Sequence, residues 1–499
     1  MTSAVDERPE VFAGPEVFTT NVPARLDRLP WSRFHWLVVG ALGVTWILDG
    51  LEVTLVSSLA GVISDRRALD LTSGEVGLTA SVYLAGAVSG ALVFGRLTDS
   101  LGRKRLFTIT VGLYAVATLM TAFSWDAWSF SAFRFLTGAG IGGECAAVNS
   151  AIQELIPARR RGATDLIING SYWLGAALAA VGSVVLLNGR FLPPEIAWRL
   201  AFLIGAILVV PVLYARRALP ESPRWMMTHG RAAEAERVVE AIERSVVAEH
   251  GRAALAGEAP SITLQTRGGV GFGEVISILL RRYPRRTILA LTLMTTQAFC
   301  YNAIFFTYAL ILTRFYQTPA GLVGWYLLPF AIGNFLGPLL LGGLFDQLGR
   351  RFMISLTYAL AGVLLALTGW LFHQGLLDAL TQTLAWTIIF FFASAAASAA
   401  YLTIGECFPL ETRAMSIALF YALGTGIGGV AAPAIFGALI GSGSRTNILW
   451  GYLFGGALML AAAAVALALG VRAERAPLES IAPPLSCPPE EWMRKRAQT

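Results

Sequence analysis

The chain has 499 residues, of which 55% are hydrophobic and only 14% are charged, and its formal net charge is +6. Because a soluble chain of this length usually carries about 25% charged residues, the composition argues against a soluble protein. Apolar runs recur along the chain, and each has the roughly 20 residues that a helix needs to cross a hydrocarbon core about 30 Å thick. The composition therefore predicts an all-α membrane protein.

The apolar runs predict twelve transmembrane helices. The first begins near Trp36, because residues 1–30 are polar and rich in acids and prolines, which predicts a disordered cytoplasmic tail rather than a signal peptide. The predicted helices cover residues 36–62, 76–98, 106–125, 127–155, 164–188, 196–217, 288–313, 321–345, 352–373, 376–405, 413–440 and 447–471.

A long polar segment at 218–287 separates the first six predicted helices from the last six. It is rich in Arg, Glu and Ala, which predicts a cytoplasmic linker with short surface helices. We therefore expect an N-terminal six-helix bundle at 31–217 and a C-terminal six-helix bundle at 288–471. Residues 472–499 are Pro-rich and predict a second cytoplasmic tail.

Basic residues gather in alternate loops between the predicted helices. Cytoplasmic loops carry the excess of Lys and Arg, so these loops and both termini are expected to face the cytoplasm. This placement accounts for the positive net charge, so the charge does not indicate nucleic-acid binding. It predicts a multi-pass protein of the bacterial cytoplasmic (inner) membrane. The basic loops contain Arg96, Arg103, Lys104, Arg105, Arg159, Arg160, Arg161, Arg216, Arg217, Arg224, Arg350, Arg351 and Arg413.

Two composite motifs occur once in each half of the chain. The pattern Gly-x-Leu-x-Asp-x-x-Gly-Arg-(Lys/Arg) begins at Gly95 and again at Gly342, 247 residues later. The pattern Glu-x-x-Pro-x-x-x-Arg begins at Glu154 and again at Glu406, 252 residues later. This repeat predicts two similar bundles related by a pseudo-two-fold axis, a common plan of transporters whose substrate site lies between the halves.

These motifs resemble those of the major facilitator superfamily. The segment 95–105 resembles its signature loop between the second and third helices, and 342–351 resembles the second copy of that loop. The segment 134–144 resembles its helix-4 signature. The resemblance covers roughly residues 31–471 and implies the twelve-helix major facilitator fold.

Two further segments resemble particular branches of that superfamily. Asp49-Gly-Leu-Glu52 looks similar to the first-helix motif of the metabolite:proton symporters, which include aromatic-acid and niacin carriers and the synaptic-vesicle-protein-2-like group. The aromatic-acid carriers usually end this motif in Asp, and Glu52 departs from that pattern. Pro220-Glu-Ser-Pro-Arg-Trp225 is similar to a sugar-porter motif that follows the sixth helix.

The resemblance implies a secondary active transporter rather than an enzyme. It implies proton-coupled symport, in the uptake direction, of a small organic solute such as an organic acid or a sugar. The protein would work by alternating access, as a monomer, with protons and the solute as its small-molecule partners and without a cofactor. Two alternatives stay open: a receptor-like binding protein of the same fold that does not transport, and a proton-driven exporter.

The repeated loops predict a conformational latch between the bundles. In the family, the acid of this loop is thought to cap a neighbouring helix and to pair with the arginine in one conformation only; the alternative is a basic loop that merely sets topology. An anion at a helix N-terminus is worth about 0.3–1 kcal/mol, enough to bias two states without freezing either. The predicted latch residues are Gly95, Asp99, Gly102, Arg103, Lys104, Glu154, Arg161, Asp346, Gly349, Arg350, Glu406 and Arg413.

Acidic residues in the predicted helices are candidates for proton coupling. Asp49 and Glu52 lie three residues apart on one helical face, and Glu144 lies in the middle of the fourth helix. An acid at the bilayer centre costs about 2.5–3.5 kcal/mol, so such residues usually face a water-filled path. Arg134 could steady an acid or bind an anionic solute. The alternatives are a helix break at Asp49-Gly50, a structural ion pair for Arg134, and a pairing of Glu144 with Arg134 or with a first-helix group.

Polar and aromatic residues in the predicted helices are candidates for solute binding, because pockets combine aromatic walls with a few polar groups. Each of them could instead serve only helix packing. The candidates are Asn149, Asn169, Tyr172, Trp173, Gln297, Tyr301, Asn302, Asn334 and Tyr401. The sequence contains neither a phosphate-binding G-x-x-x-x-G-K-[ST] loop nor an HExxH motif, and the spacing of its four cysteines predicts no metal site.

Overall fold

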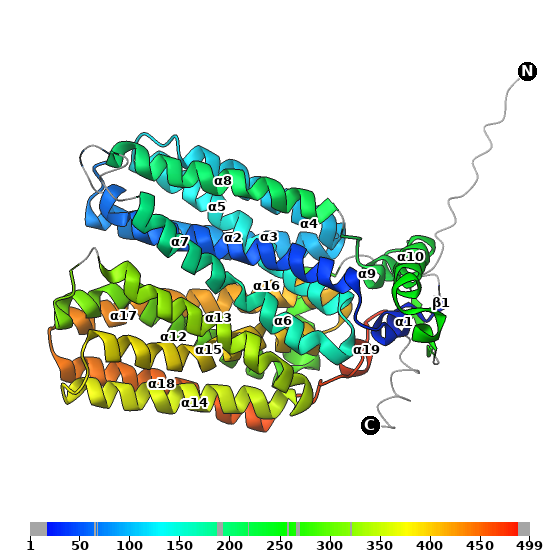
Figure 1. The fold of residues 1–499 in the computed structure, drawn as a ribbon. Helices are drawn as coiled ribbons and strands as arrows, with labels where there is room; N and C mark the ends of the chain where they lie inside the picture. Colours follow the sequence, from blue (N-terminus) through cyan, green and yellow to red (C-terminus); the bar gives the residue numbers. More distant parts are fainter. Residues whose placement is uncertain are drawn as a thin grey trace, which may run out of the picture.

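Long helices run side by side over most of the chain (Figure 1). The computed structural model describes residues 17–63, 66, 68–186, 193–217, 219–256, 259–265, 270–319 and 322–487. Within these ranges the long helical segments number twelve. They are α2 (Arg33–Ile63), α3 (Ser73–Leu101), α4 (Arg103–Thr121), α5 (Ala127–Leu155), α6 (Arg161–Gly170) followed by α7 (Tyr172–Leu186), α8 (Pro194–Arg217), α12 (Pro284–Tyr316), α13 (Val323–Gln347), α14 (Arg350–His373), α15 (Ala379–Cys407), α16 (Arg413–Gly424) continued by the π-helical η6 (Thr425–Gly429) and α17 (Val430–Gly441), and α18 (Arg445–Leu469).

Most of these segments have the composition of membrane spans. In the described part of the chain, ten are long and apolar enough to cross a bilayer. Helices α4 and α5 fall outside that group, and α5 carries Arg134, Glu144 and Glu154 along its length. Large apolar side chains such as Trp128, 82% exposed, and Ile207, 66% exposed, face outward, as lipid contact requires.

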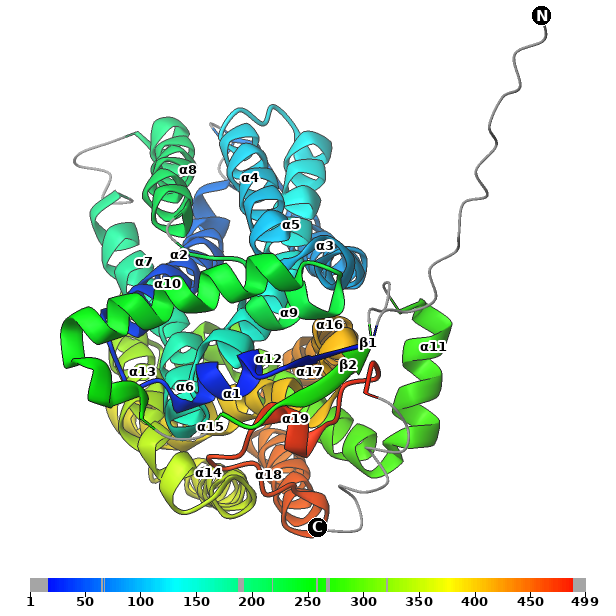
Figure 2. The same cartoon turned by 90° about the vertical axis from the view of Figure 1, so that its right-hand side faces the viewer.

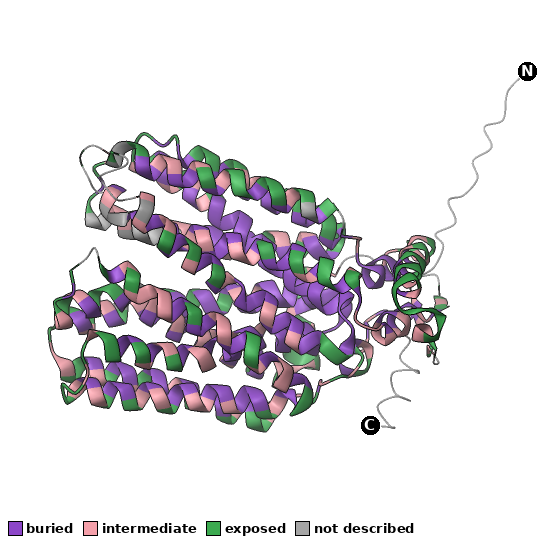
Figure 3. Cartoon of the chain, viewed as in Figure 1, coloured by how far each residue is buried: buried purple, intermediate pink, exposed green. Residues whose placement is uncertain are grey.

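The helices form two bundles that meet along their inner faces. Helices α2–α8 lie in one bundle and α12–α18 in the other, and buried residues concentrate where the bundles meet (Figures 1 and 3). Between the bundles, α3 packs against α16, and α6 packs against α13 in a corresponding position. Within the first bundle, α5 approaches α3 so closely that a Cβ at Gly142 would lie 2.0 Å from the Ala87 carbonyl oxygen, so glycine is required there.

A polar layer covers one end of both bundles, and we call it the end layer (Figure 2). In it, β1 pairs antiparallel with β2, and Val17 lies opposite Gln265. Short helical turns, η1 (Ala158–Arg160), η2 (Arg252–Leu255), η3 (Ile278–Arg282) and η5 (Leu410–Thr412), and α11 (Phe272–Ser277) connect the remaining elements. The end layer consists of β1 (Val17–Thr20), α1 (Val22–Arg28), α9 (Pro223–Thr228), α10 (Ala232–His250), β2 (Ile262–Gln265) and α19 (Leu478–Ile481).

The prediction of a disordered tail is wrong for residues 17–30. Helix α1 buries Val22 and Leu26 against Trp225 and Val239, so the segment gains an apolar core of its own. Arg25 of α1 also donates to Glu243 of α10, at 2.5 and 3.1 Å. The polar composition of residues 1–30 gives no indication of this short amphipathic helix. Residues 1–16 of the predicted tail lie outside the described residues.

Candidate functional site

A cavity of about 250 Å³ lies between the two bundles, about midway along the helices. Its walls are aromatic rings interrupted by amides and hydroxyls, and Asp49 is the one charged side chain among the described residues that line it. Eight residues predicted from the sequence line it: Asp49, Asn169, Tyr172, Trp173, Gln297, Tyr301, Asn302 and Tyr401. No group of three His, Cys, Asp or Glu side chains in the described ranges is arranged to hold a metal ion.

Two predicted solute-binding residues lie behind the cavity wall. Asn149 accepts a hydrogen bond from Asn169 at 3.1 Å, and Asn334 accepts one from the Tyr301 hydroxyl at 2.8 Å. Both are fully buried and orient residues that line the cavity. Sequence reasoning missed several lining residues, because they stand in apolar helices without a motif: Trp46, Tyr83, Cys145, Ser394, Ser398, Tyr421 and Thr425.

Asp49 is buried without an ion pair. Its side chain is 3% exposed, its Oδ1 atom has no hydrogen-bond partner, and no cation in the described part of the chain forms a salt bridge with it. The helix break considered for Asp49-Gly50 is absent, since α2 runs unbroken through both residues. Gly50 instead allows a close approach of α7, where a Cβ would lie 1.9 Å from the Tyr172 carbonyl oxygen.

The other two intramembrane acids each have an arginine partner. Glu52 pairs with Arg134, whose guanidinium also lies over the Tyr83 ring at 4.6 Å. Glu144 pairs with Arg216, which also donates to the Thr45 hydroxyl. All four side chains are buried, so each acid lies beside an arginine away from water.

The location expected for Arg216 is therefore wrong. The sequence groups Arg216 with a basic loop, at the end of the predicted helix 196–217. Helix α8 ends at Arg217 as predicted, but its last turn directs Arg216 into the bundle toward Glu144. The pairing considered between Glu144 and Arg134 is also absent, because Arg134 is taken by Glu52. A loop arginine and a span arginine cannot be distinguished by composition when they lie within one turn of a helix end.

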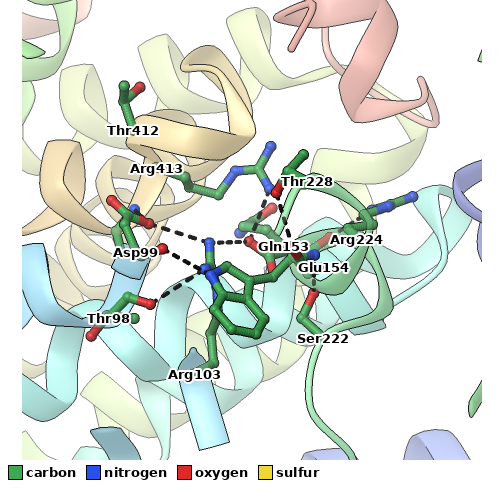
Figure 4. A network of polar contacts seen from close by, with 12 residues as sticks. Thr98, Asp99, Arg103, Gln153, Glu154, Ser222, Arg224, Thr228, Thr412 and Arg413 are labelled. Atoms are coloured by element: carbon green, nitrogen blue, oxygen red, sulfur yellow. Dashed lines mark hydrogen bonds and ion pairs between the residues drawn. The ribbon is translucent and has the colours of Figure 1, made fainter. Parts of the chain in front are cut away.

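The first repeated loop joins the bundles at the end-layer side. Asp99 of α3 accepts hydrogen bonds from the backbone N–H groups of Met415 at 2.9 Å and Ala414 at 3.3 Å, at the N-terminus of α16. Arg103 pairs with Asp99 at 3.3 Å and with Glu154 at 2.8 Å (Figure 4). Arg413 of the opposite bundle reaches Glu154 at 3.3 Å.

The second loop repeats this arrangement from the other bundle. Asp346 of α13 accepts from the N–H groups of Ala163 at 2.8 Å and Gly162 at 3.1 Å, at the N-terminus of α6. Arg350 pairs with Asp346 at 2.8 Å and with Glu406 at 3.0 Å. Arg161 lies 3.9 Å from Glu406 across the interface. Both predicted latch loops are therefore engaged at once.

Four further members of the predicted latch make no ion pair across the interface. Gly102 and Gly349 adopt φ angles of 96° and 100°, which favour glycine at the turn that ends α3 and α13. Gly95 lies at the interface against Ala418. Lys104 is exposed and donates to the Arg217 carbonyl oxygen at 3.2 Å within its own bundle, so the structure does not bring it to the interface.

The end layer adds charges to the latch that sequence reasoning missed. Asp27 of α1 contacts Arg161 at 2.9 Å and Arg224 of α9 at 2.9 Å. Glu479 of α19 also contacts Arg224, at 3.2 Å. These carboxylates lie in segments that read as tails, so only the folded arrangement reveals their role.

Comparisons with known proteins agree with this architecture. Residues 50–481 match the family model described as sugar (and other) transporter. The chain is 27% identical to a niacin transporter of Acinetobacter baylyi over 92% of this chain and 99% of that protein, and 26% identical to a probable 4-methylmuconolactone transporter of Cupriavidus pinatubonensis over 77% and 79%.

A solved structure confirms the predicted fold. The chain aligns with a proton:xylose symporter of the major facilitator superfamily, bound to 6-bromo-6-deoxy-D-glucose, at a TM-score of 0.72. The two sequences are 16% identical over 90% of this chain and 98% of that one. The prediction of twelve transmembrane helices in two six-helix bundles is thereby confirmed.

Proposed function

Because this chain belongs to the sugar (and other) transporter family of membrane transporters and is not an enzyme, we propose that it takes up a small organic solute together with protons. The proposed units are a bundle at 31–217 and a bundle at 288–471, which rock about the central cavity in a monomer. The end layer and both termini would face the cytoplasm, in keeping with the basic loops on that side.

The proton-coupling proposal depends on the position and the missing ion pair of Asp49. It lines the cavity as a buried acid without a cation, whereas Glu52 and Glu144 are matched by Arg134 and Arg216. An unpaired anion at this depth is costly, and one bound proton removes the charge. Proton binding at Asp49 would then accompany solute binding in the same cavity.

The lining favours a single-ring solute over a large one. The volume of about 250 Å³ lies below the roughly 300–1,000 Å³ of pockets that hold drug-sized ligands, which disfavours a drug exporter. Trp46, Tyr172 and Trp173 contribute aromatic rings to the wall, and Gln297 and Asn302 contribute amides. We therefore propose a monocyclic aromatic acid or amide, a class that includes the compound named for the Acinetobacter relative.

Arg134 and Arg216 are committed to Glu52 and Glu144, so an anionic solute would meet no free arginine at the described cavity wall. The solute would thus bind through its ring and hydrogen bonds, with a proton on Asp49 removing the repulsion between two carboxylates.

The experiment is uptake into proteoliposomes with an imposed pH gradient. Labelled nicotinate, nicotinamide, benzoate and xylose are compared, with an uncoupler as control. Accumulation of a ring compound that the uncoupler abolishes supports the proposal. Equal uptake with and without the gradient would show that the protein is a facilitator without proton coupling. Selective uptake of xylose would contradict the proposal of an aromatic acid or amide as solute.

A further inference from the structure

A carboxylate without an ion pair lies between the cavity and the latch. Asp165 of α6 is fully buried, one helical turn from Asn169 at the cavity and one turn from Arg161 at the latch. Neutral amides contact it: Gln153 Nε2 donates to Oδ1 at 2.7 Å, and Asn169 Nδ2 donates to Oδ2 at 3.1 Å. No salt bridge to Asp165 forms among the residues that the structure describes.

The amides around Asp165 have unused acceptors. The Oε1 atom of Gln153 and the Oδ1 atom of Asn169 are buried and lack a hydrogen-bond partner. A half-turn of the Gln153 amide would present its oxygen to Asp165, and a protonated carboxyl group would then supply the missing donor. The two amides can therefore hold Asp165 in either charge state.

The charged groups that face Asp165 are already committed to one another. Arg350 of α14 holds both Glu406 of α15, at 3.0 and 3.1 Å, and Asp346 of α13, at 2.8 Å. Arg161 at the start of α6 is shared between Asp27, at 2.9 Å, and Glu406, at 3.9 Å. A proton on Asp165 would therefore remove an anion that the neighbouring arginines do not neutralise.

The pocket of Asp165 is closed by the interface between the bundles. Gln153 of α5 packs against Gly405 of α15, where a Cβ would lie 2.6 Å from Gln153 Cγ. Separation of the bundles at the end layer would remove this contact and admit water. Because Asn169 touches both the cavity and Asp165, the pocket has one side toward the solute and one side toward the latch.

We propose that Asp165 is a second proton-binding site, which takes up a proton in the closed state as the Gln153 amide turns and releases it when the end-layer side opens. This inference rests on the proposed proton coupling. It adds Asp165 to Asp49 as a second residue that binds a proton during transport. It assigns the Gln153 and Asn169 amides as the groups that hold Asp165 in both charge states.

Infrared spectroscopy of the purified full-length chain tests the proposal without any solute. The carbonyl stretch of protonated carboxyl groups is recorded across a pH series for the wild-type protein and for Asp165→Asn. The matched control is Asp70→Asn, at an exposed position. We expect one titrating band to be lost in Asp165→Asn and kept in the control; identical spectra of wild type and Asp165→Asn would overturn the proposal.

A second variant guards against misfolding of Asp165→Asn. Gln153→Leu keeps the Asp165 carboxyl group and removes the amide oxygen that would accept a hydrogen bond from it. The frequency of the Asp165 band should therefore change. An unchanged frequency would overturn the proposed pocket. Since no solute is added, absence of proton-driven uptake in proteoliposomes would count against the proposed function alone.

Discussion

Gly95 of α3 faces the methyl group of Ala418 in α16, where a Cβ at position 95 would lie 2.4 Å from that methyl carbon. A larger side chain cannot fit unless the bundles separate at the end-layer side. We therefore predict that Gly95→Leu holds that side open. Spin labels at the exposed positions 100 and 348, one in each bundle, should move apart in a pulsed electron-resonance distance measurement.

Gly112 provides the matched control for this substitution. A Cβ at Gly112 of α4 meets no atom within 4 Å, so Gly112→Leu should leave the label distance unchanged. If Gly95→Leu also left the distance unchanged, tight packing at this point would not hold the closed state.

Asp99→Asn should weaken the latch without preventing membrane insertion. The variant loses the charge that receives the N–H groups of Ala414 and Met415 and that pairs with Arg103. A loss of about 1–3 kcal/mol would change the ratio of closed to open protein roughly 5–150-fold. Uptake should fall while the amount of protein in the membrane stays the same; full uptake would argue for a purely topological loop.

The Glu52–Arg134 pair predicts non-additive effects on stability. Glu52→Gln leaves the Arg134 charge buried without its partner, which typically costs about 3–5 kcal/mol. Removing both charges in Glu52→Gln/Arg134→Gln should restore much of that loss. Thermal unfolding of the purified protein measures this, and additive losses in the double variant would show that the two side chains act independently.

His229 predicts that the end layer weakens in mild acid. Burial lowers the pKa of His229 below its usual value, and its ring stacks on Trp225 at a centroid distance of 4.3 Å. The folded layer thus binds fewer protons than the unfolded one. The stability contributed by neutral His229 is therefore full above about pH 6.5 and is lost progressively as the pH falls below that value toward the lower pKa of the folded state.

Hydrogen exchange of α9 and α10 measures this effect. Exchange should accelerate as the pH falls below about 6.5, after correction for the intrinsic pH dependence of exchange, and His229→Phe should abolish the added acceleration because the phenyl ring cannot be protonated. The same acceleration in His229→Phe would assign the pH dependence to another group.

The sequence predicts the helices and the latch more completely than it predicts the cavity. The latch is encoded in repeated local motifs, so Asp99 and Asp346 can be matched to each other from the order of residues alone. The cavity wall is built from single residues of several helices, and Tyr83 and Tyr421 carry no local signal. Their selection depends on the packing angle of the bundles, which one sequence does not determine.

The partners of buried charges are the least predictable feature. Arg134 lies 82 positions from Glu52 in the chain, and Arg216 lies 72 from Glu144. Such pairings depend on which helix faces turn inward. Asp165 carries no distinguishing signal for the same reason: it follows the basic run 159–161, and composition alone suggests a loop end rather than a buried carboxylate.

The end layer has a consequence for biosynthesis. The backbone N–H of Gln265 donates to the Ser486 carbonyl oxygen at 2.8 Å, and the Glu411 carboxylate accepts from the backbone N–H of Ser486 at 2.9 Å. Strand β1 therefore pairs with β2, and β2 in turn bonds to residue 486. Since translation proceeds from the N-terminus, the helices can insert while the ribosome is still at work, but the contacts of this layer with Ser486 can form only after residue 486 has been made.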